Sequence, residues 1–315
     1  MKRFGFTKDL FAKNDQMKVS APGKLILLGE HAVVYHRPCL VSAVSKRLKL
    51  GIQKIKRKIV QIEKGDKKGF VKTAVKNFSE KYGLDFGVKI ETEKGFDLNY
   101  GLGSSAAVTV SVLRGLAELA NIKMAKRELF NFAYKTVLDV QGVGSGFDVA
   151  AAIYGGTIYF KTGGEEIEKI GDFDLPIIVG YSGVKADTPT LVKKVVEGKK
   201  RHPQIVEKIF NEIENLVEEG REVLLEKNWK RLGELMNINQ KLLENLGVST
   251  EKLQRMIYEA RMAGALGAKL SGAGGGDCMI ALVDPKDRAD VERVIEKAGG
   301  EIVKLNFSAE GVKVE

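Results

Sequence analysis

Gly101 and Gly103, with the two serines that follow them, form the stretch of this sequence best suited to binding an anion. Two glycines two residues apart let the backbone approach a ligand without obstruction by a Cβ atom. The apolar run over 108–119 predicts a buried helix, whose first N–H groups lack partners within it. Such N–H groups and hydroxyls suit a phosphate group or a metal ion. Taken alone, the stretch is better explained by turn and capping chemistry, so an anion site requires other glycine-rich elements to converge on it.

Three titratable side chains lie beside glycines near the start of the chain. Lys24 follows Pro22–Gly23, which interrupts a predicted strand, and a second, buried strand is expected over 25–28. Glu30 and His31 come where a loop would leave the sheet, a common place for functional residues. A lone histidine is more often structural than catalytic, and a loop glutamate is often solvated. The structural and functional interpretations of this pair therefore carry about equal weight.

Two more glycine-rich segments follow along the chain. Asp148 ends a glycine-rich turn and precedes the apolar segment 149–154. A carboxylate at the edge of a core is costly unless it has a partner or a role, and a helix cap is an equal alternative. The glycines of 272–276 lie between predicted strands over 268–271 and 278–283. This order does not fit the strand–glycine–helix fingerprint of dinucleotide binding, and no P-loop pattern occurs, so a bound nucleotide would be held by other means.

Apolar spacing predicts the elements that would position these residues. We expect helices over 70–82 and 126–140, and strands over 48–62, 88–92, 157–160, 177–181, 301–305 and 312–314. A later helix should carry an apolar stripe of Ile205, Ile209, Ile213 and Val217, and Asp284 with Pro285 should begin the last helix. The polar stretch 163–174 is the best candidate for a boundary between two halves.

Composition limits the class of protein. The chain has 315 residues, 44% of them hydrophobic, and no apolar run approaches the roughly 18 to 20 residues of a membrane span. The net charge of +10 fits anionic ligands and would equally fit nucleic acid, but the basic residues are scattered among acidic ones, as on a solvated face. Cys39 and Cys278 lie far apart without metal-ligand spacing, which indicates a reducing cytoplasm. The basic segment 1–16 is expected to be a loosely docked extension.

The glycine-rich elements together resemble the three motifs of the GHMP small-molecule kinases, and within that group those of the mevalonate kinases. The likeness runs from about residue 19 to the C-terminus, and the segments that carry it are Lys24 with 29–35, 101–107, Gln141 with 145–148, 181–183 with Thr188, 235–239, and 267–276. It implies an α+β fold of two domains, one like domain 2 of ribosomal protein S5 over 17–170 and one ferredoxin-like over 171–315. The active site would lie between them.

The resemblance also implies roles for particular residues. Asp148 and Lys24 would be catalytic, with Asp148 approaching the acceptor hydroxyl and Lys24 pairing with Asp148 and stabilising the transferring phosphoryl group. ATP would be held by Gly101, Leu102, Gly103, Ser104, Ser105, Ala106, Gly274 and Gly275, and Mg²⁺ by Ser105. The acceptor would be oriented by Glu30, His31, Thr188, Gly272 and Ala273. Alignment and charge compensation of this kind are what phosphoryl transfer needs.

The implied reaction is ATP-dependent phosphorylation of the primary hydroxyl of mevalonate to 5-phosphomevalonate. The partners would be ATP and this small molecule, without nucleic acid or membrane, and a homodimer is left open. Four departures from the family pattern bear on this. Val137 replaces the usual magnesium-binding glutamate, and Asp97 replaces the proline usual before the phosphate loop. The substrate loop reads Asp187–Pro189 in place of Ser-Thr-Lys, and Asp277 adds a negative charge beside the glycine loop. A phosphomevalonate kinase, with Lys185 as a candidate phosphate ligand, stays the nearest alternative. An RNA-binding protein and an inactive metabolite sensor are alternatives of other classes.

Overall fold

The first sheet is built on a long antiparallel pair, β1 (Met17–Leu28) and β2 (Pro38–Ile55). Their register shifts between Pro22 and Gly23. The prediction of two strands separated at this point is therefore wrong, because β1 is one strand with a bulge. Proline has no N–H to donate to a ladder, and an irregular register lets the pairing continue past it. The computed structural model describes residues 16–63, 66, 68–93 and 100–315, so all of the predicted extension except Gln16 lies outside the described residues.

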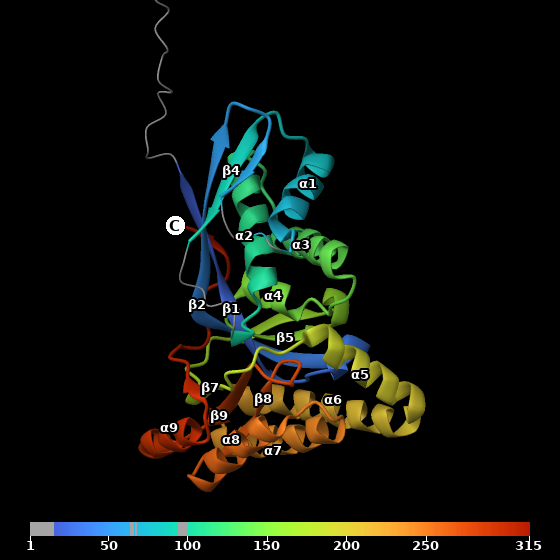
Figure 1. The fold of residues 1–315 in the computed structure, drawn as a ribbon, viewed down its shortest axis with the longest axis vertical. Helices are drawn as coiled ribbons and strands as arrows, with labels where there is room; N and C mark the ends of the chain where they lie inside the picture. The colour runs from blue at the N-terminus through green and yellow to red at the C-terminus, as the bar shows by residue number, and fades with distance from the viewer. Residues whose placement is uncertain (1–15, 64–65, 67, 94–99) are drawn as a thin grey trace, which may run out of the picture.

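The first lobe holds a seven-stranded sheet with helices packed on one face (Figure 1). The remaining strands of this sheet are β3 (Val60–Ile62), β4 (Gly87–Thr92), β5 (Thr157–Lys161), β6 (Ile167–Gly171) and β11 (Lys313–Val314). Its helices are α1 (Phe70–Tyr82), α2 (Ser104–Leu119), α3 (Lys126–Gln141) and α4 (Phe147–Tyr154). The predicted strand over 48–62 divides into the end of β2 and the separate edge strand β3.

Helix α2 lies at the centre of this lobe and packs on β1 and β2. Val110, Val112 and Leu116 are completely buried, and almost every residue from Ala106 onward faces other side chains. The prediction of a buried helix is therefore confirmed. Burial on all sides keeps the N-terminus of α2 in a fixed place, which suits a site that must hold a ligand in register.

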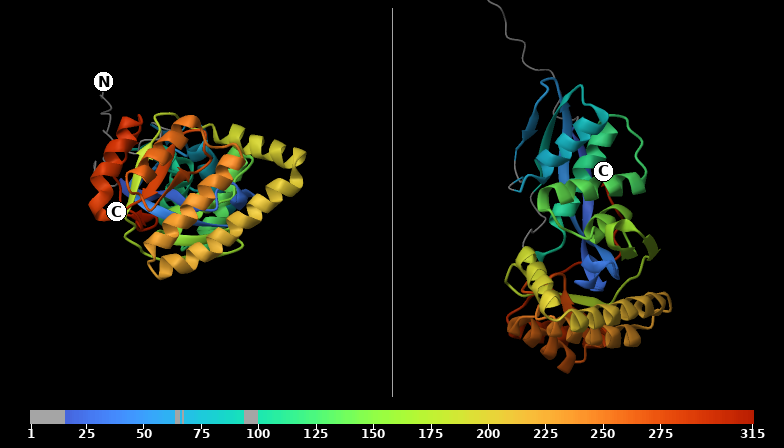
Figure 2. Two further views of the ribbon diagram at one scale, coloured as in Figure 1. Left: turned by 90° about the horizontal axis from the view of Figure 1, so that it is seen from below. Right: turned by 90° about the vertical axis from the view of Figure 1, so that its right-hand side faces the viewer.

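The second lobe is a four-stranded sheet in the order β10-β7-β9-β8 with helices on one side (Figure 2). Its strands are β7 (Ile177–Tyr181), β8 (Gly267–Ser271), β9 (Cys278–Leu282) and β10 (Glu301–Ile302). Its helices are α5 (Thr188–Arg201), α6 (Pro203–Leu225), α7 (Trp229–Asn245), α8 (Glu251–Met262) and α9 (Arg288–Lys297). Short 3₁₀ turns occupy Ala32–Tyr35, Thr162–Gly164 and Pro285–Asp287.

Two details of the second lobe differ from prediction. Ile205 is 60% exposed although Ile209 and Ile213 are buried, because positions four apart drift by about 40° around a helix of 3.6 residues per turn. The expected start of the last helix is a 3₁₀ turn that precedes α9, and Asp284 makes no side-chain capping bond there.

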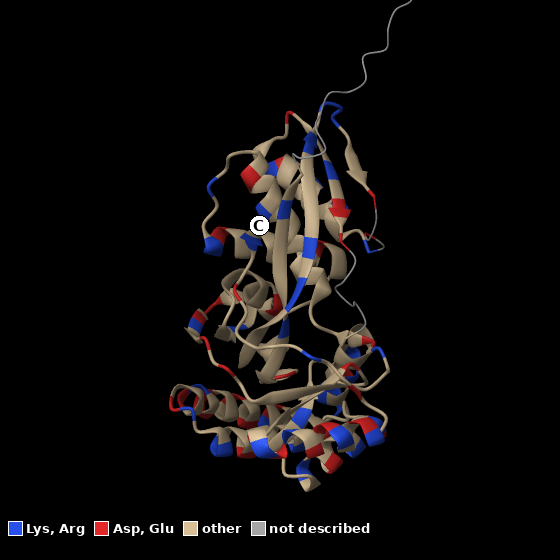
Figure 3. Ribbon diagram, turned by 90° about the vertical axis from the view of Figure 1, so that its left-hand side faces the viewer, with Lys and Arg blue, Asp and Glu red and all other residues tan. Residues whose placement is uncertain are grey.

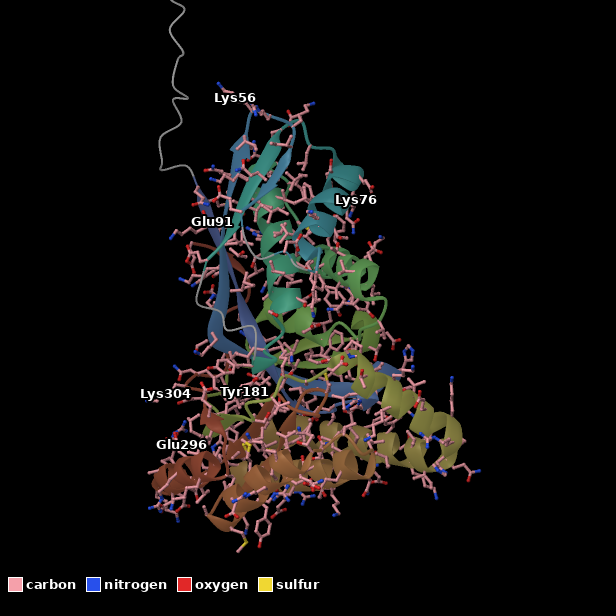
Figure 4. All side chains as sticks on the ribbon, in the orientation of Figure 1. Lys56, Lys76, Glu91, Tyr181, Glu296 and Lys304 are labelled. Atoms are coloured by element: carbon pink, nitrogen blue, oxygen red, sulfur yellow. The ribbon has the colours of Figure 1, made fainter. Side chains whose placement is uncertain are left out.

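The two sheets share the chain without a clean break. Strand β6 ends at Gly171 in the first sheet, β7 begins at Ile177 in the second, and β11 returns to pair with β1. Tyr181 lies where the two lobes meet (Figure 4), and the centroid of its ring is 5.1 Å from the centroid of the Tyr100 ring. The predicted α+β class is confirmed, and the boundary at 170/171 stays a prediction. No helix within the described residues is long and apolar enough to cross a membrane.

Candidate active site

The loop before α2 is the first part of the candidate site. Gly101 and Gly103 have φ of 71° and 81°, backbone conformations that glycine adopts without strain. The N-cap of α2 is Gly103, and no side chain caps the helix, so the first N–H groups face the loop without a side-chain acceptor. The backbone N–H of Lys24 donates a hydrogen bond of 2.9 Å to the carbonyl of buried Leu102, which fixes the loop to the bulge of β1. Ser104 and Ser105 are half-buried in the first turn, and Ala106 is buried.

Lys24 and Asp148 meet at this loop from different elements. The Lys24 ammonium donates to the Gly101 carbonyl at 3.1 Å, and Asp148 lies in the first turn of α4. A Cβ atom on Gly103 would lie 3.2 Å from Lys24 Cγ and 3.6 Å from Asp148 Cβ. The absence of a side chain at Gly103 therefore lets all three approach one another. Lys24 and Asp148 both belong to the described residues, and their side chains do not form the expected ion pair.

Burial sets the electrostatics of this pair. Desolvation raises the pKa of Asp148, and the positive charge of Lys24 opposes that rise. Desolvation likewise lowers the pKa of Lys24, while the carboxylates of Asp148 and Asp277 oppose the fall. A carboxyl whose pKa is raised is a better proton acceptor once it is ionised, and a buried cation close by can stabilise developing negative charge. The pair can therefore serve a proton transfer with charge compensation.

Glu30 and His31 lie in a second polar cluster at the end of β1. Glu30 forms an ion pair with Lys269 of β8, and both side chains are almost completely buried. Lys269 also donates to the Leu270 carbonyl at 2.7 Å, whereas Glu30 Oε2 has no hydrogen-bond partner. Burial raises the pKa of the Glu30 carboxyl and lowers that of the Lys269 ammonium. The interpretation of Glu30 as a solvated loop residue is therefore wrong.

The His31 ring contacts the glycine loop. Its Nε2 lies 2.9 Å from the Ala273 carbonyl, and burial lowers its pKa, which favours a neutral ring that donates this hydrogen bond. The side chain of Ser271 bridges the Ile26 N–H and carbonyl at 3.1 and 2.9 Å. These bonds join the end of β1 to the end of β8, so the structure brings Glu30, His31 and Ala273 together beside the loop over 272–276.

The glycines of that loop differ in their surroundings. A Cβ atom on Gly272 would meet nothing within 4 Å, so this position is open. On Gly274 it would overlap the Val248 carbonyl, and on Gly275 it would lie 2.7 Å from a Leu191 methyl. Gly275 also donates its N–H to the Val248 carbonyl at 2.8 Å. Gly274 and Gly275 are therefore needed for packing, and their predicted contact with ATP stays a prediction.

Side chains of α7 hold the edge strand that leads into this loop, a feature that sequence reasoning missed. Gln240 accepts the Leu270 N–H at 2.9 Å, and Asn237 accepts the Ala268 N–H at 3.1 Å and donates to the Leu266 carbonyl. Arg261 of α8 donates to the Ala268 carbonyl at 2.6 Å. These amide and guanidinium groups occupy the hydrogen-bonding positions of a neighbouring strand, which positions the start of the glycine loop. The segment 235–239 was recognised in the sequence, but nothing in its pattern indicated this task.

The predicted acceptor residue Thr188 and the departure at Val137 both lie apart from these contacts. Thr188 begins α5 and is exposed, and none of the described hydrogen bonds joins it to another candidate residue. Val137 is 3% exposed within the core of the first lobe. The nearest carboxylate in sequence, Asp139, pairs at the surface with Lys135. Among the described residues, no group of three or more histidine, cysteine or acidic side chains could hold a metal ion.

Comparison with known families matches both lobes. Residues 69–156 match the GHMP kinases N terminal domain, and residues 221–301 match the GHMP kinases C terminal family. The first match spans the loop before α2 and Asp148, and the second spans α7 and the glycine loop. The family matches therefore cover the two segments that converge on the candidate site.

Relatives and solved structures agree with these matches. A mevalonate kinase of Pyrococcus furiosus is 37% identical, covering 95% of this chain and 99% of the relative, and one of Archaeoglobus fulgidus is 38% identical over 84% and 92%. The structure of L. major mevalonate kinase in complex with R-mevalonate is 25% identical, with a TM-score of 0.80 and coverage of 95% and 98%. The Methanococcus jannaschii mevalonate kinase is 26% identical, with a TM-score of 0.79 and coverage of 95% and 100%. The chain belongs to the GHMP kinases, and its relatives assign it to the mevalonate kinase family within them.

Proposed function

We propose that the protein transfers the γ-phosphoryl group of ATP to the primary hydroxyl of mevalonate, giving 5-phosphomevalonate and ADP. The observation that carries this proposal is the convergence of Lys24, Asp148 and the uncapped start of α2 on Gly103. A helix N-terminus with free N–H groups suits phosphate, and the buried lysine and carboxylate suit proton transfer and charge compensation beside it. The relatives named mevalonate kinase, which match nearly the whole chain, support mevalonate as the acceptor.

Each residue has a proposed task in this reaction. The loop over 101–106 binds the phosphates of ATP, and Asp148 accepts the proton of the acceptor hydroxyl. Lys24 stabilises the negative charge that spreads over the transferred group. The neutral His31 ring donates a hydrogen bond to the Ala273 carbonyl and so fixes Ala273 and the open position at Gly272 on the acceptor side. Glu30 supports this arrangement through its buried ion pair with Lys269. Thr188 is proposed to reach the acceptor from the start of α5.

Magnesium is proposed to arrive with the nucleotide. Ser105 offers one hydroxyl oxygen in the first turn of α2, and Val137 offers no ligand at the position where a glutamate is usual. Mg²⁺ commonly takes few protein ligands together with substrate phosphates and water, so this small donor set fits it. When bound, the ion would neutralise part of the phosphate charge.

The charge distribution supports small anionic partners. Basic and acidic residues are interspersed along the helices of the second lobe (Figure 3). This mixture favours a solvated face over a nucleic-acid interface. A cytoplasmic location and a homodimer stay predictions.

The test of the proposed function is ADP release by the purified protein with ATP and Mg²⁺. Mevalonate, 5-phosphomevalonate, homoserine and galactose serve as acceptors in parallel reactions. We expect turnover with mevalonate and background rates with the other three. Turnover with 5-phosphomevalonate alone would keep the phosphoryl-transfer mechanism and overturn the acceptor, and background rates with all four would overturn the proposed function.

A further inference from the structure

Asp277 holds a carboxylate in a fixed position at the end of the glycine loop. Its φ of 52° is a left-handed conformation that few residues other than glycine, asparagine and aspartate adopt readily. The backbone of Asp277 donates to the Val184 carbonyl at 2.7 Å and accepts the Ser182 N–H at 2.9 Å. Its Oδ1 accepts from the Lys185 ammonium at 2.9 Å and from the Ala186 N–H at 3.1 Å. The carboxylate is therefore tied to the segment 182–186, which leads into α5.

The other oxygen of this carboxylate faces the loop before α2. A Cβ atom on Gly101 would overlap Asp277 Oδ2 and Cγ, so glycine is required where the two loops touch. The Gly101 carbonyl accepts the Lys24 ammonium on the same loop. Cys278, the next residue, has its Sγ 3.2 Å from the Tyr100 carbonyl. A negative charge thus lies directly against the loop to which the proposed function assigns the phosphates of ATP.

Two like charges close together in a partly buried place repel each other, and an uncompensated carboxylate here would oppose the binding of phosphate. The Asp277 side chain is only 12% exposed, so water screens it weakly. Lys185, in the segment 182–186, supplies the opposite charge, and its own side chain is 48% exposed. Burial lowers the pKa of the Lys24 ammonium, the Asp277 carboxylate opposes that fall and the Lys185 charge adds to it, so both charges lie close enough to act on this buried group.

We propose that Lys185 supports ATP binding by neutralising Asp277, so that the two residues act as one unit that sets the affinity of the phosphate loop. The proposal rests on the proposed function, because it takes ATP to be the ligand of that loop. It differs from a direct role in which Lys185 contacts a phosphate of ATP or of the acceptor. It also differs from a purely structural role in which the pair only fastens the segment 182–186.

A double-variant cycle distinguishes these roles. The variants are Lys185→Met, Asp277→Asn and the two combined, and Lys193→Met, which removes an exposed lysine of α5, is the matched control. Asparagine is chosen at 277 because it tolerates the left-handed backbone. The dissociation constant of ATP is measured by calorimetry without acceptor, with and without Mg²⁺, at low and physiological salt. The melting temperature is recorded for each variant.

We expect Lys185→Met to weaken ATP binding about tenfold at low salt, and less at physiological salt because ions screen the repulsion. The loss should be larger for ATP without Mg²⁺, which carries more negative charge. Asp277→Asn should bind ATP at least as tightly as the wild type. The combined variant and Lys193→Met should both fall within about twofold of the wild type, since neither leaves an unpaired carboxylate beside the loop.

Three results, each with a wild type that binds ATP, would overturn the inference and leave the proposed function standing. A loss in Lys185→Met that Asp277→Asn does not rescue would assign Lys185 to direct phosphate contact. Equal losses in both single variants, together with lower melting temperatures, would leave only a fastening role. Unchanged affinity in Lys185→Met would remove the role altogether while the wild type still binds ATP. If the wild type itself binds no ATP, the proposed function fails and the inference fails with it.

Discussion

Two buried pairs of a lysine and a carboxylate occur within the described part of the chain, and the two pairs are arranged differently. Lys269 and Glu30 are in direct contact, almost completely buried, and enclosed between the two lobes. Lys24 and Asp148 lie beside each other at Gly103 without an ion pair, and the lysine donates to a backbone carbonyl instead. We call Lys269 with Glu30 the closed pair, because each charge is compensated by the other. We call Lys24 with Asp148 the open pair, because its carboxylate and ammonium stay available to a ligand.

This difference separates structure from chemistry within one short segment of the chain. Lys24 and Glu30 both belong to the end of β1 and the turn after it, and both are charged residues next to glycine. The two residues differ in their partners, since Lys24 lies beside Asp148 and Glu30 is paired with Lys269. We therefore infer that the Lys24 and Asp148 pair governs turnover, while the Lys269 and Glu30 pair governs stability and the placement of His31.

The largest expected effect is on turnover in Asp148→Asn. Loss of the proton acceptor should lower kcat by about a thousandfold, while the dissociation constant of ATP stays close to that of the wild type. Steady-state kinetics and calorimetry measure the two quantities. Asp172→Asn, which neutralises an exposed aspartate paired with Lys169, is the matched control. Full activity in Asp148→Asn would show that the open pair is not catalytic.

The next effect concerns Lys24→Met and the pH dependence of the reaction. We expect kcat to fall by about a hundredfold, because a buried charge beside the phosphate loop is lost. Asp148 must be ionised to accept a proton, so the wild-type rate should fall as the pH drops through the pKa that burial has raised. Lys24 opposes that rise, so its removal should move the acid limb of kcat/KM to higher pH. A limb that stays in place would separate Lys24 from Asp148.

The closed pair should respond in stability. Lys269→Met leaves the Glu30 carboxylate buried without its partner, which should cost about 3 to 5 kcal/mol of unfolding free energy. Burial raises the folded-state pKa of Glu30, so the variant should be most stable at low pH and lose stability as the pH rises through that pKa. Urea unfolding at several pH values measures both effects.

Two further variants sharpen this stability test. Glu30→Gln combined with Lys269→Met should cost less than either single change, because neither buried charge is left alone. Lys241→Met, which breaks an exposed ion pair with Glu244, should cost no more than about 1 kcal/mol. An equally small cost for Lys269→Met would contradict the assignment of this pair to stability.

The smallest expected effect lies at the edge of β8. Gln240→Leu leaves the buried Leu270 N–H without an acceptor, which should lower the unfolding free energy by about 1 to 3 kcal/mol. Gln254→Leu on the exposed face of α8 provides the control in the same urea experiment. A cost no larger than that of the control would show that α7 does not hold β8 through this bond.

Local pattern was sufficient to predict several elements. The spacing from Phe70 to Tyr82 gave the bounds of α1, because its apolar residues face one core and Gly83 ends the helix. The apolar run over 108–119 predicted the burial of α2 for the same reason. The continuity of β1 through Pro22 was missed, because it depends on pairing with β2, where Arg47 lies opposite Pro22, and the pattern within 17–28 does not contain that pairing.

The candidate site was only partly predictable for a related reason. Nearby glycines drew attention to Lys24, to the loop at Gly103 and to Asp148 in the sequence. That these three residues lie together could be seen only in the folded structure. Lys269 is a single charged residue within a strand of mostly small and apolar residues, a pattern that indicates a buried charge in need of a partner. The sequence does not indicate which partner, because Glu30 is 239 positions earlier. Likewise, nothing local to Asp277 indicates that Lys185 neutralises it.

The most direct test of the central claim compares kcat at saturating ATP and mevalonate for Asp148→Asn and Glu30→Gln, at a temperature where circular dichroism shows both folded. The open pair should be essential to turnover and the closed pair should not. We therefore predict a kcat about a thousandfold below that of the wild type in Asp148→Asn and a rate within about tenfold of the wild type in Glu30→Gln. Near wild-type turnover in Asp148→Asn, or an equal loss in both variants, would contradict the account.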